Sequence, residues 1–226
     1  MIIPKRILVL APHTDDGELG AGGAISYYIE NGAEVFYAAF STAEESVPDG
    51  FPKDILKSEV KKATKCLGIK KENLFIYGYP VRKLNYNRQE ILETLVALKK
   101  EVQPDLVFIP SLKDIHQDHS TIAQEGLRAF KNTSILGYEL IWNNLSFDTP
   151  SFIPLEKRHV QAKADSLKEY KSQGQRDYMS TEFIFSLAKT RGVQIGTEYA
   201  EAFEVVRLIL KLSLIHISEP TRQWQI

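Results

Sequence analysis

The chain has only one cysteine, Cys66, so it cannot form a disulfide within itself. A chain of 226 residues with a lone thiol suits a reducing compartment, which predicts a cytoplasmic location. Long apolar runs are also missing, since none approaches the roughly 18 residues that a membrane span needs. The N-terminus carries Lys5 and Arg6 before a short strand and has no signal-peptide pattern. We therefore expect no membrane span.

An excess of either charge is absent as well. The formal net charge is −1, and no block of basic residues is present, so the sequence gives no reason to expect nucleic acid as a partner. Hydrophobic residues make up 43% of the chain, which is enough for one large core. No internal repeat or low-complexity segment is present. The composition favours one globular domain, and it leaves the oligomeric state open, homo-oligomer included.

Short apolar strands alternate with amphipathic segments along most of the chain. This alternation predicts an α/β fold, a Rossmann-like three-layer sandwich around a mostly parallel sheet. The expected strands are 6–12, 34–41, 73–80, 105–111, 134–142 and 201–210. The expected helices are 20–32, 54–69, 88–104, 120–131, 156–173 and 181–196, and the second of these places Cys66 as a small buried residue.

The last residues depart from this alternation. We expect a single domain over residues 1–212, followed by a tail over 213–226, "SLIHISEPTRQWQI", that is either non-native or disordered. His216 and Trp224 are therefore left out of the candidate site.

Two clusters of acids and histidines follow predicted strands. His13, Asp15, Asp16 and Glu18 come after the first strand in "PHTDDGE", and "HQDH" at 116–119 comes after the fourth. Ligands of open parallel sheets bind at the carboxyl ends of the strands, and both clusters lie at that edge. A histidine–aspartate pair in one loop is often only a turn, but two such clusters at one edge predict a functional site.

Imidazole nitrogens and carboxylate oxygens together suit a catalytic zinc, which takes three protein ligands and keeps one position open. His13, Asp16 and one histidine of the second cluster could supply these ligands. Asp15 would then be the general base, the unused histidine would assist the oxyanion and leaving group, and Asp118 would orient that histidine. The residue types leave Fe²⁺ or another divalent ion open.

Glycines follow the first cluster in "GAGG", residues 20–23. Their spacing is not the G-x-G-x-x-G of dinucleotide-binding loops, and the preceding carboxylates would repel a pyrophosphate. We expect instead that the small residues allow a close approach of backbone to metal or substrate, with helix N–H groups facing the pocket.

The pairing of "PHTDDGELGAGG" with "HQDH" resembles the PIG-L/LmbE-like zinc deacetylases, over about residues 5–210. The resemblance implies removal of acetyl from an N-acetylglucosamine-type sugar, with zinc on His13, Asp16 and His119. It implies Asp15 as general base and His116 as transition-state stabiliser and acid, supported by Asp118. Thr14 replaces the family's usual proline, and Gly17 stands where the family has glutamate, which leaves the role of Glu18 undefined.

The expected function is thus a metal-dependent hydrolase that deacetylates a small N-acetyl amino sugar, free or conjugated to a nucleotide or lipid. One alternative is another metal-dependent amide or ester hydrolase on the same site. The other is a non-catalytic protein that binds a sugar or nucleotide. Among residues outside the two clusters, Arg82 and Arg191 are candidates for binding a phosphate or a sugar hydroxyl, with surface ion pairs as the competing interpretation.

Overall fold

A seven-stranded sheet forms the centre of the protein in the computed structural model, which describes residues 4–210. The strands lie in the order β3-β2-β1-β4-β5-β7-β6. They are β1 (Arg6–His13), β2 (Glu34–Ser41), β3 (Leu74–Ile76), β4 (Leu106–Pro110), β5 (Ser134–Tyr138), β6 (Ser151–Leu155) and β7 (Tyr199–Arg207). The α-helices are α1 (Asp16–Glu30), α2 (Ile55–Cys66), α3 (Arg88–Val102), α4 (Gln117–Ala129), α5 (Lys157–Leu167) and α6 (Thr181–Gln194).

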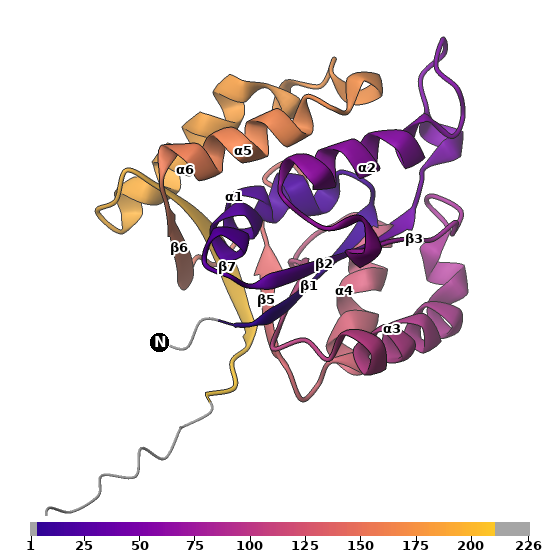
Figure 1. The fold of residues 1–226 in the computed structure, drawn as a ribbon. Helices are drawn as coiled ribbons and strands as arrows, with labels where there is room; N and C mark the ends of the chain where they lie inside the picture. The colour runs from indigo at the N-terminus through magenta and orange to yellow at the C-terminus, as the bar shows by residue number, and fades with distance from the viewer. Residues whose placement is uncertain (1–3, 211–226) are drawn as a thin grey trace, which may run out of the picture.

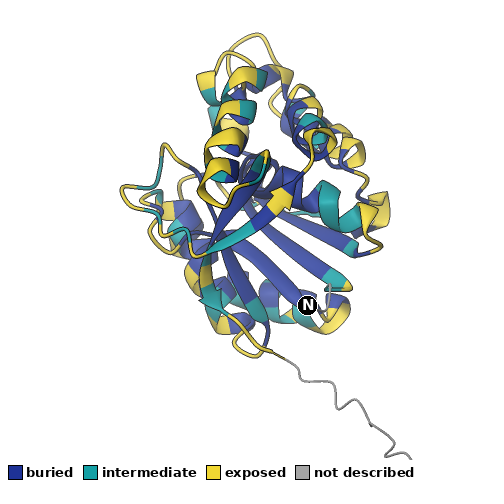
Figure 2. Cartoon of the chain, turned by 90° about the vertical axis from the view of Figure 1, so that its left-hand side faces the viewer, coloured by how far each residue is buried: buried dark blue, intermediate teal, exposed yellow. Residues whose placement is uncertain are grey.

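Helices cover both faces of the sheet, which confirms the expected three-layer α/β sandwich. Helices α1, α2, α5 and α6 lie on one face, and α3 and α4 lie on the other (Figure 1). Side chains of β1 alternate between two cores: Ile7 and Val9 pack with the first helix set, whereas Leu8 and Leu10 pack with α3 and α4. Because both faces are covered, the strands are largely buried between more exposed helices (Figure 2).

The chain reverses its direction of winding between β1 and β4. Both strands are parallel neighbours in the sheet, but β1 leads to α1 on one face and β4 leads to α4 on the other. Such a switch point opens a crevice at the carboxyl ends of the two strands, where ligands of open α/β sheets bind. The two sequence clusters follow these two strands.

The sheet differs from the expectation at one side. Strand β7 runs antiparallel to β5, and β6 pairs antiparallel with β7 at the edge. Strand β6 was not expected, because it is five residues long and contains Pro154, which a sheet tolerates at an edge. Cys66 is exposed and not buried, because it lies beside the buried stripe of α2 that includes Val60 and Ala63.

Among residues 4–210, no helix is both long and apolar enough to cross a bilayer. The tail expected over 213–226 lies outside the described residues. The single-domain boundary at 212 therefore stays a prediction.

Candidate metal and catalytic site

The first cluster lies where β1 passes into α1. His13 is the last residue of β1, Asp15 is the residue before the helix, and Asp16 begins α1. The helix starts four residues earlier than expected, so Asp16 and Glu18 belong to its first turn. A carboxylate is favoured in that turn by the helix dipole. The Oδ2 atom of Asp16 also accepts a hydrogen bond from the backbone N–H of His13 at 2.7 Å, which fixes the turn.

The second cluster lies at the start of α4, which begins at Gln117 and not at residue 120. His116 precedes the helix and caps it, because its Nδ1 accepts a hydrogen bond from the backbone nitrogen of Asp118, 3.2 Å away. Asp118 and His119 are buried in the first turn. The first helical turn places His119 at the pocket and Asp118 behind His13.

Three donor atoms from the two clusters converge. The Nδ1 atom of His13 lies 3.1 Å from Oδ2 of Asp16, and Nε2 of His119 lies 3.2 Å from each of these atoms. A tetrahedral zinc with bonds of about 2.0–2.2 Å holds its ligand atoms roughly 3.3–3.6 Å apart. The triangle of donor atoms therefore fits a divalent cation.

His116 adjoins this triangle. One ligand atom each from His13, His116 and His119 can be chosen so that all lie within 4.8 Å of one another, so this histidine cluster could also hold a metal. The ring of His116 stacks on that of His119, with centroids 4.5 Å apart. The tighter set of donor atoms is the one that includes Asp16.

A buried carboxylate holds each histidine of the triangle. Asp118 Oδ2 lies 3.0 Å from Nε2 of His13, and Asp114 Oδ2 lies 2.7 Å from Nδ1 of His119. Such contacts fix the orientation of a metal-binding imidazole and raise its basicity. The structure thus corrects the expected role of Asp118, whose carboxylate orients His13 and not His116. Asp114 was missed, although its place in "DIHQDH" gave a signal.

The electrostatics of the cluster follow from burial and close charges. Burial disfavours the charged form of His13 and His119, but the adjacent carboxylates prevail and raise the pKa of His13 to about 9 and that of His119 to about 10. The same histidines hold the pKa of Asp16 far below its ordinary value, despite burial. Burial and the charge of Asp16 raise the pKa of Asp15 to about 6. Burial and the two other histidines lower the pKa of His116 to about 4.

Glu18 lies beneath the site and does not reach the triangle. Its side chain is fully buried and contacts the hydroxyls of Tyr37 and Tyr170, the latter at 2.9 Å. Both hydroxyls also approach the carbonyl oxygen of Thr14, at 2.9 and 2.6 Å. Gly17 permits this arrangement, because a Cβ there would meet the Tyr37 ring at about 2.5 Å. Glu18 therefore supports the backbone of the first cluster from below.

The "GAGG" segment does not face the site, contrary to the expectation. Helix α1 is kinked at Ala21, and the freed N–H groups of Gly23 and Ala24 donate to the carboxylate of Glu201 at 3.0 and 2.7 Å. A Cβ on Gly20 would clash with the Tyr138 ring. These small residues allow close packing against the sheet.

A pocket of about 420 Å³ opens at the donor atoms. Asp15, Asp16 and the three clustered histidines line it, together with Arg82, Ser46, Trp142, Asn143, Arg176 and Tyr178 among others. Its volume is within the range of small-molecule sites. The predicted catalytic and ligand residues therefore share one pocket, except Asp118, which lies behind His13.

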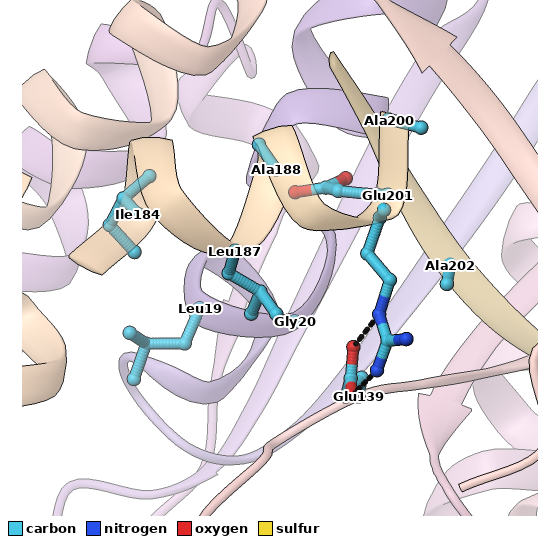
Figure 3. Close-up of a pocket in the computed structure, with 10 residues that line it drawn as sticks. Leu19, Gly20, Glu139, Ile184, Leu187, Ala188, Ala200, Glu201 and Ala202 are labelled. Atoms are coloured by element: carbon cyan, nitrogen blue, oxygen red, sulfur yellow. Dashed lines mark hydrogen bonds and ion pairs between the residues drawn. The ribbon is translucent and has the colours of Figure 1, made fainter. Parts of the chain in front are cut away.

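A second cavity, of about 20 Å³, has room for roughly one water molecule. It lies under α6, beside Leu19 and Glu201 (Figure 3). Arg191 borders it and donates to both carboxylate oxygens of Glu139, with 3.0 Å between Nε and Oε2. This ion pair accounts for Arg191, which does not line the larger pocket.

Comparison with known proteins decides the family. The sequence profile described as "PIG-L: GlcNAc-PI de-N-acetylase" matches residues 8–130, more than half of the chain and both clusters. The chain belongs to the PIG-L family. The expected resemblance is confirmed.

Individual relatives are more distant. Over 138 residues the chain is 26% identical to diacetylchitobiose deacetylase of Thermococcus kodakarensis, which covers 59% of this chain and 51% of that protein. Over 126 residues it is 29% identical to 4-oxalmesaconate hydratase of Pseudomonas putida, which covers 51% of this chain and 47% of that protein. The chain thus spans about half the length of these curated relatives.

The fold of this family member extends beyond the matched segment. The conserved protein TT1542 of Thermus thermophilus superposes with a TM-score of 0.77 at 23% identity, covering 92% of this chain and 97% of that one. This likeness confirms the LmbE-like fold class across nearly the whole described region.

Proposed function

We propose that the protein is a zinc-dependent N-deacetylase that removes the acetyl group from an N-acetylated amino sugar. The observation that carries the proposal is the triangle formed by His13 Nδ1, Asp16 Oδ2 and His119 Nε2, with edges of 3.1–3.2 Å, beside Asp15 in one pocket. Membership of the PIG-L family and the similarity to a diacetylchitobiose deacetylase support the reaction class.

His13, Asp16 and His119 are the proposed ligands. When bound, zinc supplies Lewis acidity, which lowers the pKa of water and polarises a carbonyl group. Asp118 and Asp114 hold the two imidazoles through their 3.0 and 2.7 Å contacts and would keep them oriented toward a bound ion. N/O ligands accept Fe²⁺ and other divalent ions as well, so metal content has to be measured.

Asp15 is the proposed general base. Its carboxylate forms no hydrogen bond or ion pair with another side chain among residues 4–210, although it lines the pocket. It can therefore accept a proton from the attacking water and return it to the amine nitrogen as the C–N bond breaks. The products are acetate and the free amino sugar.

His116 is the proposed oxyanion stabiliser. Its Nδ1 accepts the N–H of Asp118, so the neutral ring carries its hydrogen on Nε2. That N–H can donate to the oxygen of the acetyl carbonyl as negative charge develops on it. Of the two roles expected for His116, the geometry favours this one over that of proton donor.

Two matched variants test the proposal through acetate release from a panel of N-acetyl sugars. We expect Asp15→Asn to retain zinc but to lose turnover by about 10²- to 10⁴-fold, because general-base catalysis contributes that much. We expect His119→Ala to lose both zinc and turnover. Wild-type turnover by the Asp15→Asn variant would refute the assignment of the base.

The hydratase relative favours a second candidate, addition of water to an unsaturated acid at the same site. The two reactions are separated by their products. If zinc-loaded protein releases no acetate but lowers the ultraviolet absorbance of an unsaturated dicarboxylic acid, the second proposal replaces the first. Retention of zinc with neither activity would favour a binding protein or another amide or ester hydrolase.

A further inference from the structure

A buried polar group lies beneath Asp15 and is not used by the proposed mechanism. It consists of the hydroxyls of Tyr37, in β2, and Tyr170, in the turn after α5, together with the carboxyl of Glu18, in α1. All three residues are at most 1% exposed. Thr14 and Asp15 line the pocket, whereas these three residues do not. Any effect of the group on the chemistry therefore passes through the residues above it.

The two tyrosine hydroxyls converge on one peptide group. Both lie within hydrogen-bond distance of the carbonyl oxygen of Thr14, the Tyr37 hydroxyl at 2.9 Å and the Tyr170 hydroxyl at 2.6 Å. That oxygen belongs to the planar peptide unit that joins Thr14 to Asp15. The Tyr37 hydroxyl also accepts a hydrogen bond from the backbone nitrogen of Gly17, 3.1 Å away, whose N–H has no partner inside its helix. The backbone is thus held on both sides of the two aspartates.

The Asp15 side chain depends on this backbone for its position. Within residues 4–210, its carboxylate forms no hydrogen bond with another side chain and does not cap α1. Thr14 cannot fix the turn by itself, because it lacks the ring that fixes φ in proline and its buried Oγ1 has no hydrogen-bond partner among these residues. The hydrogen bond between the His13 backbone and Asp16 spans the Thr14 carbonyl without involving it. The peptide before Asp15 is therefore held mainly by the two hydroxyls.

The turn that carries Tyr170 is itself anchored. Two positions further on, the backbone N–H of Ser172 donates to one carboxylate oxygen of Glu59, in α2, at 3.0 Å, and the Ser172 hydroxyl donates to the other at 2.6 Å. Both residues are buried. Glu18 contacts the Tyr170 hydroxyl at 2.9 Å from the other end. A buried network that is satisfied in this way is rigid, so it can hold the Thr14 carbonyl in one place.

We propose that Tyr170 is a positioning residue for the general base: together with Tyr37, it holds the Thr14–Asp15 peptide so that the Asp15 carboxylate stays in the pocket beside the metal triangle. This inference rests on the proposed function, because it takes Asp15 as the base. The contact joins residues 156 positions apart and brings in a segment outside both clusters. Loss of the hydroxyl lets the peptide rotate, and a displacement of about 1 Å at a catalytic group can cost about 10²-fold in rate.

Tyr170→Phe removes the hydroxyl and keeps the ring. Acetate release from N-acetylglucosamine and from its methyl glycoside by zinc-loaded protein gives kcat and KM separately. We expect kcat to fall about 10- to 100-fold while KM and the zinc Kd stay within about threefold of wild type, because no pocket wall and no ligand changes. Tyr138→Phe is the matched control, since the Tyr138 hydroxyl is also buried and donates to the carbonyl oxygen of Leu10, in β1, at 3.0 Å. It should lower the unfolding temperature as Tyr170→Phe does but keep the wild-type kcat.

A double-mutant cycle identifies the residue through which Tyr170 acts. When Asp15→Asn has removed the base, adding Tyr170→Phe should lower the remaining turnover by less than about threefold, because the group that Tyr170 positions is already inactive. An equal loss in both backgrounds would show that Tyr170 acts on another group and would overturn the proposal. Wild-type kcat in Tyr170→Phe, or the same kcat loss in Tyr138→Phe, would overturn it as well.

Crystal structures of wild type and of both phenylalanine variants test the positioning role without any activity. In Tyr170→Phe we expect the Thr14–Asp15 peptide to rotate and the Asp15 carboxylate to move by more than about 0.5 Å, the tolerance within which catalytic groups are held. In Tyr138→Phe it should stay in its wild-type place. An unmoved Asp15 in Tyr170→Phe would overturn the positioning role, whereas absence of acetate release by wild type from every sugar of the panel would overturn only the deacetylase.

Discussion

At the scale of single residues, the carboxylates behind the histidines decide the geometry of the site. The Asp118 side chain is fully buried and accepts hydrogen bonds from the backbone N–H groups of Arg82 and Leu84. It also contacts the His13 ring, so it connects the turn before α3 to the end of β1. Asp114 accepts from the backbone N–H of His116 at 2.8 Å as well as contacting His119. Each carboxylate therefore fixes one imidazole and one segment of backbone.

Replacing these carboxylates should weaken metal binding without removing a ligand. We expect Asp118→Asn and Asp114→Asn each to lower zinc affinity by about 10- to 100-fold, because the imidazoles lose orientation and basicity. Competition with a chromogenic chelator measures this. Asp148→Asn, at an exposed partner of Lys113, is the control and should bind zinc like wild type. Unchanged affinity in both test variants would show that the carboxylates do not support the ligands.

At the scale of elements, the entry of each helix into the sheet edge matters most. Helix α1 begins at Asp16 and α4 at Gln117, so both clusters combine the end of a strand or loop with a first helical turn. At its other end, α1 is tied to α5, because Glu30 contacts the guanidinium of Arg158 at 2.8 Å and the ring of His159 at 2.5 Å.

This contact predicts an acid-dependent contribution to stability. Hydrogen bonds from Arg158 and His159 lower the pKa of Glu30 from 4.5 to about 2. Because the pKa of Glu30 is lower in the folded protein, the ionised Glu30 stabilises the fold above pH 4.5. This contribution to stability is lost as pH falls from 4.5 to about 2. Wild type should therefore unfold at a higher temperature than Glu30→Gln at about pH 6, with the difference shrinking toward about pH 3. A difference that is constant over this range in calorimetric scans would contradict the assignment.

The sequence predicted most elements and the two clusters, since buried parallel strands and amphipathic helices have clear periodicities. It placed the start of α1 at residue 20, because the glycine-rich run looks like a helix start, whereas the helix begins at Asp16 and is kinked at Ala21. It assigned Asp118 to the nearer histidine in sequence. The contact with His13, 105 residues away, depends on the pairing of β1 and β4, which local pattern does not encode.

At the scale of the whole molecule, the site joins two halves of the fold. His13 ends β1, and Asp16 begins α1 on one face of the sheet, whereas His119 comes from α4 on the other face. A metal held by all three would link α1 and α4, which belong to opposite layers, at the carboxyl ends of the central strands. With a metal bound, the switch point between β1 and β4 would serve as both binding crevice and structural junction.

Zinc should therefore stabilise the native state. A ligand present at about 100 times its Kd adds about 2.7 kcal/mol to the free energy of unfolding when it binds only the folded chain. We expect zinc to raise the unfolding temperature of wild type and of Asp15→Asn, and not that of His119→Ala. An equal rise of the unfolding temperature in all three proteins would show that the stabilising zinc binds at another site.

Anomalous diffraction at the zinc edge, from crystals of the zinc-loaded protein, locates the ion most directly. We expect one strong peak within about 2.0–2.2 Å of His13 Nδ1, Asp16 Oδ2 and His119 Nε2, with Asp15 unbound beside it. A peak coordinated by His116 in place of Asp16, or by Asp15 itself, would contradict the ligand set and the choice of base.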